Sequence, residues 1–266
     1  MRYSVGAVAK VMGLTPGALH YYEREGLLSG GRMENGYRYY DDGDIWKLLS
    51  YEKYHSMGYP IKMVIDQFTG NATRAMIEAR VRDRREEALA KSAYYKHLAD
   101  SIDEHIKAHE RIDELLDGYA LERARALYFW HADNGWMSRN RRQQEIAAQW
   151  VGAMPTAQIA AVLDADAPDG KAVFGYSIIA GRAREIGFEL PEDARLLPET
   201  SCLHTVVVCD NEFAFHPEIA FREGLAYCRE RGFRVHSASV ARVLLVETNK
   251  SGGPKNAYID VWIPIA

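Results

Sequence analysis

The sequence predicts an α+β fold in three successive parts, and three observations lead to this prediction. Short helical segments separated by tight turns fill residues 1–74. A helical periodicity then runs from residue 75 to residue 118 without an internal turn signal. After that the pattern changes to strands and helices in the order β-α-β-β, and this order occurs twice. We therefore expect three regions with the boundaries 1–74, 75–118 and 119–266.

Composition favours a soluble, cytoplasmic protein. The 266 residues are enough for two domains with their own cores, and 47% hydrophobic with 26% charged residues is ordinary for a globular chain. No apolar run could span a bilayer, and Lys10 interrupts the short apolar stretch at the start, which is unlike a signal peptide. The three cysteines cannot all pair and have no CxxC spacing, so we expect a reducing compartment, no metal site and no cofactor.

The first two helices are predicted from their caps. Ser4 is a suitable N-cap, and Gly13 ends the first helix. Thr15 caps the second helix, Pro16 occupies its first position, where a missing N–H costs little, and Gly26 ends it. Two short helices around a glycine-containing turn are typical of a helix-turn-helix, although a helical hairpin used only for packing has the same pattern.

A hairpin follows the second helix. Asn35-Gly36 is a strong two-residue turn signal, and Arg32 and Arg38 flank it. Asp41 or Asp42 then caps a helix that we expect to continue to about residue 57, followed by a short helix over 61–68.

The motifs YSVGAVAKVMGLT, ALHYYEREGLL, ENGYRYYDDGDI and HSMGYPIKMV, in this order, resemble the MerR family of winged helix-turn-helix transcription regulators. The resemblance covers about residues 2–70 and implies that residues 1–74 bind promoter DNA. One departure is His20, because family members usually carry arginine before the paired tyrosines. We expect phosphate contacts from Thr15, His20, Arg32, Tyr37 and Arg38, a close backbone approach at Gly17, and Ala18 and Tyr21 nearest the bases.

Charge alone does not predict DNA binding. Residues 1–72 contain eight Lys/Arg and eight Asp/Glu, and the whole chain has a net charge of -4. Any affinity for DNA must therefore come from where the charges lie rather than from their sum.

The long helix over 75–118 predicts a homodimer. Positions spaced alternately by four and three residues form a largely apolar seam, and a sustained seam of this kind favours a coiled coil. A single amphipathic helix packed on its own domain is the alternative. The family resemblance implies an antiparallel coiled coil between two subunits. The seam residues are Ile77, Val81, Arg84, Ala88, Lys91, Tyr95, Leu98, Ile102, His105, His109, Ile112 and Leu116.

Residues 119–266 resemble the GyrI-like ligand-binding domains that follow some MerR-type DNA-binding domains. The resemblance rests on the duplicated element order and on the ending YIDVWIPI, in which family members typically have Glu where this chain has Asp260. Strands are expected at RALYFWHA, AQIAAVLD, KAVFGYSII, CLHTVVVC, VARVLLVETNK and NAYIDVWIPI, and helices over 140–154 and 215–231. Turns are expected at ADAPDG and SGGP.

The last strand suggests a ligand site. Tyr258, Asp260 and Trp262 alternate with apolar residues and so share one face of the strand. Aromatic rings around a buried acid suit an organic cation, and burial should raise the pKa of that acid when the site is empty. The alternative is an edge charge or a carboxylate paired with a nearby Arg or Lys. We expect ligand contacts from Tyr128, Trp130, Phe174, Tyr176, Glu247, Tyr258, Asp260 and Trp262.

These features predict a homodimeric transcription regulator, not an enzyme, with promoter DNA, RNA polymerase and a hydrophobic, cationic small molecule as partners and no membrane association. By resemblance, it would activate transcription by distorting promoter DNA when the effector binds. Two alternatives are a small-molecule hydrolase that uses Tyr258 and Asp260, and a repressor that needs no ligand.

Overall fold

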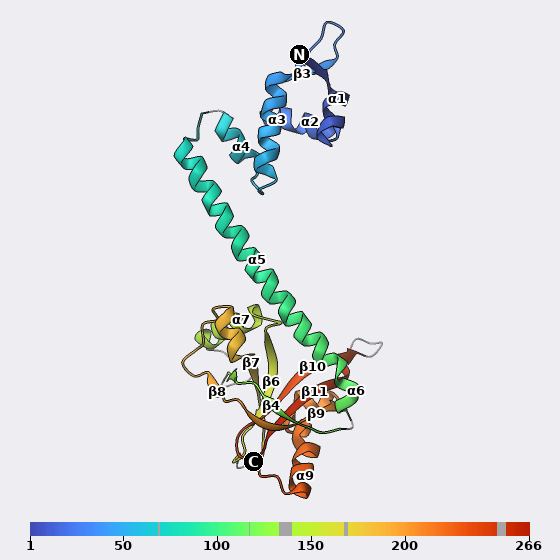
Figure 1. Cartoon of the computed structure of the whole chain (residues 1–266), viewed down its shortest axis with the longest axis vertical. Helices are drawn as coiled ribbons and strands as arrows, with labels where there is room; N and C mark the ends of the chain where they lie inside the picture. Colours follow the sequence, from blue (N-terminus) through green and yellow to red (C-terminus); the bar gives the residue numbers. More distant parts are fainter. Residues whose placement is uncertain (69, 117, 133–139, 168–169, 249–253) are drawn as a thin grey trace. The chain divides into compact units, whose positions relative to one another are not determined.

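The computed structural model describes every residue except 69, 117, 133–139, 168–169 and 249–253, and the chain forms two compact units (Figure 1). The first unit contains residues 1–92 and the second contains residues 93–266. Among the described residues, no helix is long and apolar enough to cross a membrane.

The first unit begins with the predicted helix-turn-helix. Ser4 caps α1 by accepting from the backbone N–H of Ala7, and Gly13 ends that helix in the left-handed conformation. Thr15 caps α2, and Pro16 is its first residue. The helices are α1 (Val5–Met12), α2 (Pro16–Arg24), α3 (Asp42–His55) and α4 (Ile61–Phe68).

The predicted hairpin forms, but with a wider loop than its turn signal indicated. Its strands are β2 (Gly31–Arg32) and β3 (Arg38–Asp41), and pairing stops at Arg32 and Arg38. The loop between them closes through a 2.8 Å bond from Met33 N to the Tyr37 carbonyl oxygen. A short strand that the sequence did not predict, β1 (Arg2–Ser4), pairs with the other edge of β3.

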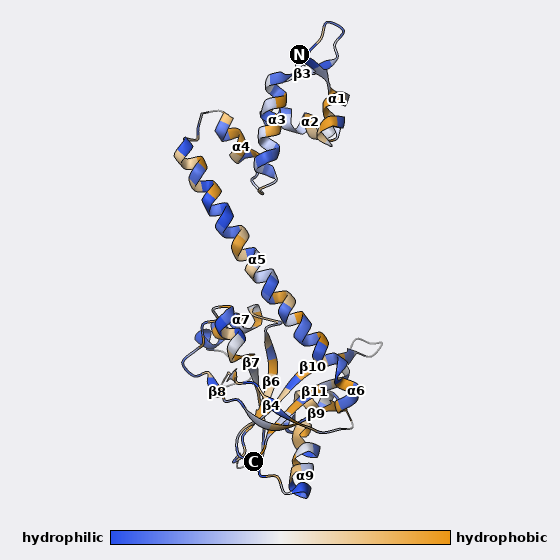
Figure 2. Ribbon diagram, viewed as in Figure 1, coloured by the Kyte–Doolittle hydropathy of each residue, from blue (hydrophilic) through white to orange (hydrophobic). Residues whose placement is uncertain are grey.

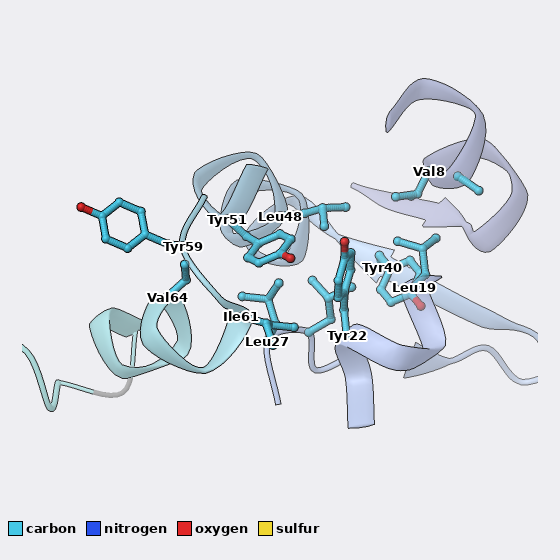
Figure 3. Close-up of a cluster of buried hydrophobic side chains, with 12 residues drawn as sticks. Val8, Leu19, Tyr22, Leu27, Tyr40, Leu48, Tyr51, Tyr59, Ile61 and Val64 are labelled. Atoms are coloured by element: carbon cyan, nitrogen blue, oxygen red, sulfur yellow. The ribbon is translucent and has the colours of Figure 1, made fainter. Parts of the chain in front are cut away.

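The core of the first unit is rich in tyrosine (Figure 3). Leu19, Leu48 and Val64 are fully buried, and they come from α2, α3 and α4. The ring of Tyr22 packs edge-on against Tyr51 with centroids 4.8 Å apart, beside Leu48 (Figure 3). Aromatic pairs with this geometry contribute about 0.5–1.5 kcal/mol beyond the area they bury.

The long helix is shorter than predicted. It ends at Glu110 as α5 (Arg74–Glu110), and the short α6 (Ile112–Leu115) follows. The C-terminal end of the expected seam packs within the second unit, because Ile112 and Leu116 belong to a cluster with the sheet. Earlier in α5, hydrophobic and hydrophilic residues alternate along the ribbon (Figure 2). Several of its apolar side chains are exposed: Val81, Leu89, Tyr94, Tyr95, Ile102 and Ile106.

The second unit is built on one eight-stranded sheet with the order β4-β9-β11-β10-β6-β7-β5-β8. The strands are β4 (Ala120–Ala124), β5 (Leu127–Trp130), β6 (Ala157–Leu163), β7 (Val173–Ile179), β8 (Arg195–Leu197), β9 (Thr200–Cys209), β10 (Ser239–Thr248) and β11 (Pro254–Pro264). The helices are α7 (Arg141–Gly152), α8 (Ala180–Glu185) and α9 (Arg222–Arg231), with 3-10 turns η2 (Asn211–Ala214) and η3 (Pro217–Phe221) before α9.

The predicted duplication is visible in the strand order. The elements β5-α7-β6-β7 and β9-α9-β10-β11 repeat one arrangement, and β6 pairs with β10 where the two repeats meet. The sequence did not predict β4, β8 or α8, and it joined the η3 turn and α9 into one helix. Parts of the predicted turns ADAPDG and SGGP, at residues 168–169 and 251–253, lie outside the described residues.

The two faces of this sheet have different neighbours. We call the face that carries Ile259, Val261 and Ile263 the helix face, because these side chains pack against residues of η3 and α9. Residues of α7 and α8 pack against the same face at the other end of the sheet. We call the opposite face, which carries Tyr258, Asp260 and Trp262, the acid face. There Val206 and Tyr258 pack against α6.

Candidate functional site

The start of α2 presents groups suited to phosphate. The Thr15 hydroxyl oxygen accepts from the Ala18 N–H at 3.2 Å, which leaves the hydroxyl hydrogen free to donate. Gly17 is exposed in the first turn, where backbone N–H groups have no partner within the helix. Ala18, which the sequence placed near bases, is half-buried.

The structure joins α2 to the hairpin through His20 and Arg38. The Arg38 Nη1 lies 2.6 Å from His20 Nδ1, and 3.1 Å from an Oε atom of Glu23. Because a guanidinium can only donate, His20 Nδ1 must accept, and the ring proton lies on Nε2. The half-exposed imidazole therefore keeps one N–H donor. Glu23 was not predicted, although its position three residues after His20 puts it on the same side of α2.

The remaining predicted DNA contacts are accessible. Tyr37 is 74% exposed at the hairpin, and Tyr21 is 39% exposed on α2. Arg32 is exposed and donates to the Gly36 carbonyl oxygen at 3.3 Å across the loop. Tyr22, for which packing was expected, is buried.

The acids of the first unit are largely engaged in local bonds. Asp41 and Asp44 form a capping box at the start of α3, and Asp44 also accepts from the Ser29 N–H at 2.8 Å. Asp42 pairs with the amino group of Met1. These bonds place negative charge at the start of α3, so residues 1–72, which carry no net charge, can still present Arg32 and Arg38 on the hairpin.

The predicted ring-lined site in the second unit does not form, because its rings lie on opposite faces of the sheet. Strand register places Phe174 beside Ala161, Ala161 beside Ala241, and Ala241 beside Val261. Because directly paired residues share a face, Phe174 belongs to the helix face. Tyr176 lies two residues after Phe174 in β7, so it is on the helix face as well. Trp130 pairs directly with Tyr176 and therefore shares that face. Only Tyr258 and Trp262 share the acid face with Asp260.

The rings on the helix face are packed into cores. Trp130 and Tyr176 pack with Trp150 of α7, Tyr128 borders the same cluster, and the Trp130 indole N–H lies 3.1 Å from each carboxylate oxygen of Asp193. Phe174 packs edge-on against Phe213 with centroids 5.2 Å apart. These contacts hold the rings within core clusters.

The other two predicted ligand contacts are also engaged. Tyr258 packs against the cluster beneath α6. Glu247 is half-buried near the end of β10 and accepts from the Asn256 side-chain amide at 3.0 Å.

Asp260 is buried and fully bonded. One carboxylate oxygen lies 2.6 Å from His204 Nε2, and the other lies 2.6 Å from Arg242 Nη2 and 2.8 Å from the Trp262 indole nitrogen. The expectation of a raised pKa is therefore wrong. Burial by itself would raise the pKa of Asp260, but the Arg242 charge and the bonds from His204 and Trp262 outweigh burial and lower this pKa to about 2.

This contact extends into a chain of alternating charges, which we call the charge network: Arg111, Glu122, His204, Asp260 and Arg242. His204 Nδ1 lies 2.9 Å from a Glu122 oxygen, and Glu122 forms a two-bond pair with Arg111 at 2.7 and 3.1 Å. Both nitrogens of His204 therefore lie within hydrogen-bond distance of carboxylate oxygens.

One pattern in the sequence points to Arg242 as the partner of Asp260. Arg242 is the only charged residue in the run VARVLLV, in the strand before the last one. A hairpin between these two strands gives an antiparallel register that can place Arg242 directly opposite Asp260, as the structure does.

A cavity of about 180 Å³ lies beside the charge network on the acid face. Arg242 and Trp262 line it together with apolar residues of several strands, among them Leu127, Ile179 and Val240. Trp262 in turn stacks on the His204 ring with centroids 3.7 Å apart. Within the described part of the chain, no group of three or more His, Cys, Asp or Glu residues could hold a metal ion.

Two short helices around a tight turn, followed by a hairpin that contacts the second helix, define the first unit as a winged helix-turn-helix domain. Residues 3–69 of this unit match the model of the MerR HTH family of regulatory proteins.

Curated relatives resemble part of the chain. SkgA of Caulobacter vibrioides, described as an HTH-type transcriptional regulator, is 31% identical over 102 residues, which are 38% of this chain and 39% of SkgA. TipA of Streptomyces coelicolor, described as an HTH-type transcriptional activator, is 40% identical over 65 residues, 24% of this chain and 26% of TipA. The chain thus spans well under half the length of these relatives.

Solved structures match only loosely. A MerR-family regulator from Bacillus cereus is 21% identical with a TM-score of 0.38, over 42% of this chain and 84% of that chain. EcmrR in a complex with DNA is 15% identical with a TM-score of 0.36, over 98% of this chain and 99% of that chain.

Proposed function

We propose that the protein is a homodimeric transcription regulator that binds promoter DNA through residues 1–74 and responds to a hydrophobic small molecule bound within residues 119–266. The observation that carries the proposal is the joined surface of α2 and the hairpin, where Arg38 bridges His20 and Glu23 in a MerR-family domain. This surface offers donors to phosphate from two elements that are fixed relative to each other.

Five of the predicted contacts have a definite physical role in this proposal. Thr15 and the exposed N–H groups near Gly17 would bind a phosphate at the N-terminus of α2, where the helix dipole favours an anion. The Nε2–H of His20 and the guanidinium of Arg38 would donate to the neighbouring backbone. Tyr21 would lie nearest the base edges, because it is exposed on the same helix.

Dimerisation would use the exposed apolar side chains of α5, within the predicted region 75–118. Tyr95 and Ile102 are 64% and 47% exposed, although they belong to the expected seam. Two heads joined in this way would contact two half-sites of one promoter. Activation would follow if the effector binds better to the dimer geometry that distorts the DNA, and RNA polymerase would then engage the distorted promoter.

The sequence suggested a cationic effector, and we do not propose one here. A cationic ligand would need an acid whose oxygens are not already bonded within the protein. Both oxygens of Asp260 already accept hydrogen bonds, and Arg242 adds positive charge beside them. The effector site that we propose is the cavity on the acid face.

The test is promoter binding at a series of salt concentrations. Replacing Arg38 with Ala should weaken binding to all DNA sequences. It should also reduce the slope of log K against log salt concentration by about one for each DNA-binding domain of the dimer, because each domain loses one phosphate contact. The matched control is Arg229→Ala, which removes an exposed arginine of α9 in the other unit. An Arg38→Ala slope equal to that of the control would remove Arg38 from the interface, and absence of promoter binding by the native chain would refute the proposal.

A further inference from the structure

The cavity on the acid face has the size of a single aromatic ring. Its volume of about 180 Å³ is close to that of an apolar cavity of about 150 Å³ that accepts benzene. Apolar side chains of β5, β7 and β10 line it, and Trp262 contributes a ring that is held by stacking on His204. A flat apolar group therefore fits this space better than a bulky one.

The described charged residues that line the cavity are all arginines: Arg123, Arg125 and Arg242. Arg123 and Arg125 are largely exposed and pair with Glu199 and Glu104. Arg242 is different, because its side chain is only 18% exposed. Its Nη2 binds Asp260, and its buried Nε has no hydrogen-bond partner. A buried donor without a partner costs roughly 1–3 kcal/mol, so the present contacts of Arg242 leave part of its hydrogen-bonding capacity unsatisfied.

The charged wall of the cavity is positive. Its three described charged lining residues are cations, and their acidic partners Glu199, Glu104 and Asp260 are not among the lining residues. The carboxylate of Asp260 also bonds to His204 and Trp262, so it is shared among three partners. An anion in the cavity would therefore lie beside cationic side chains, whereas a cation there would be repelled by them.

We propose that the cavity binds a small aromatic carboxylate, with its ring against Trp262 and the apolar wall and its carboxylate on Arg242. This inference rests on the proposed function, because it names the chemical class of the effector. A planar guanidinium matches a carboxylate in geometry, and hydrogen bonds between charged partners are the stronger ones. The size of the cavity restricts the ligand to one ring.

The experiment is calorimetric titration of the full chain with three probes of similar size: benzoate, benzyl alcohol and benzyltrimethylammonium. We expect benzoate to bind most tightly, benzyl alcohol more weakly and the cation least. Replacing Arg242 with Met should weaken benzoate roughly tenfold to a hundredfold, the range for losing a hydrogen bond to a charged group, and should change benzyl alcohol little. Arg229→Met is the matched control and should change neither.

Two further variants keep the test decisive. If Arg242→Met alone does not fold, the double variant Arg242→Met with Asp260→Asn removes both members of the ion pair and leaves neither charge unpaired. Replacing Ser237, which also lines the cavity, with Phe should fill it and abolish binding of both benzoate and benzyl alcohol.

The inference is overturned if the cation binds as tightly as benzoate, if benzoate affinity survives loss of Arg242, if the Ser237→Phe variant binds benzoate normally, or if no probe binds. Promoter binding is measured on the same preparations without any probe. Loss of the anion preference with intact promoter binding would overturn only this inference. Absence of promoter binding with intact benzoate binding would overturn the proposed function instead.

Discussion

Replacing Asp260 with Asn tests the charge network directly, because the change keeps the shape of the side chain and removes its charge. The variant leaves Arg242 and His204 facing a neutral amide in a buried site. Breaking a buried ion pair in this way typically costs about 3–5 kcal/mol of unfolding free energy.

The pKa of Asp260 gives an independent estimate. A fall from 3.8 to about 2 corresponds to about 2 kcal/mol of stability at neutral pH. This value is smaller because it compares the charged acid with the neutral acid, which keeps more of the hydrogen bonds than an amide does. We therefore expect the variant to lose between about 2 and 5 kcal/mol at pH 7.

The pH dependence of this loss has a definite sign. Because folding lowers the pKa, the stability that the carboxylate contributes is complete above the unfolded pKa and is lost as the pH falls toward the folded pKa. From the same two pKa values, about 1 kcal/mol of it is gone by pH 3. The gap between the native protein and Asp260→Asn should therefore narrow by about 1 kcal/mol between pH 5 and pH 3.

The assay is denaturant unfolding followed by tryptophan fluorescence, in a Trp46→Phe background so that the signal reports the second unit. Trp46 is 64% exposed in the first unit, so its replacement should disturb little. Asp103→Asn, an exposed change on α5, is the control. Equal stability of the native protein and Asp260→Asn at pH 7, or a gap that does not change with pH, would refute the account of the charge network.

Three further predictions concern other parts of the chain. Thr15→Ala removes the cap of α2 and should cost about 1 kcal/mol in thermal unfolding of the first unit; no change would mean that the cap is dispensable. Gly175→Ala should destabilise the chain far more than Gly224→Ala. A Cβ at Gly175 would lie 2.2 Å from a backbone carbonyl oxygen, whereas a Cβ at Gly224 would lie 2.5 Å from Cδ1 of Ile263, the end of a side chain that can move. Equal melting temperatures of the two variants would contradict this prediction. Burial raises the pKa of the Cys202 thiol to about 11, so a thiol reagent at pH 8 should label Cys202 in the denatured chain but not in the native chain, as mass spectrometry of its peptide can check.

Local signals in the sequence predicted most elements of both units. The caps Ser4 and Thr15 and the left-handed Gly13 act within one turn of the chain, so their effect can be inferred from neighbours in sequence. The alternation in the last strand likewise placed Tyr258 and Trp262 on one face together.

The failure of the predicted ligand site has a physical cause. Alternation tells which residues of one strand share a face, but it does not tell which face of one strand continues into which face of another. That relation depends on strand order and register across the whole sheet, and it placed Trp130 and Phe174 on the far side from Asp260. The partners of Asp260 depend on the same non-local information, because His204 lies 56 residues away in the chain.

The length of the long helix was overestimated for a related reason. A heptad pattern continues through Ile112 and Leu116, but these side chains satisfy it by packing beneath the sheet. His109 likewise lies against β10, with its Nε2 3.1 Å from the Leu244 carbonyl oxygen. Periodicity therefore indicates an apolar stripe without indicating what covers it.

The alternation of sign along the charge network constrains how this region can change during evolution. Each interior member contacts two neighbours in the network, so a single replacement breaks hydrogen bonds to both of them. A replacement at Glu122 would be tolerated best when Arg111 or His204 changes with it. We therefore expect substitutions at these five positions to occur in covarying pairs among homologues. The apolar positions around them should change independently of one another.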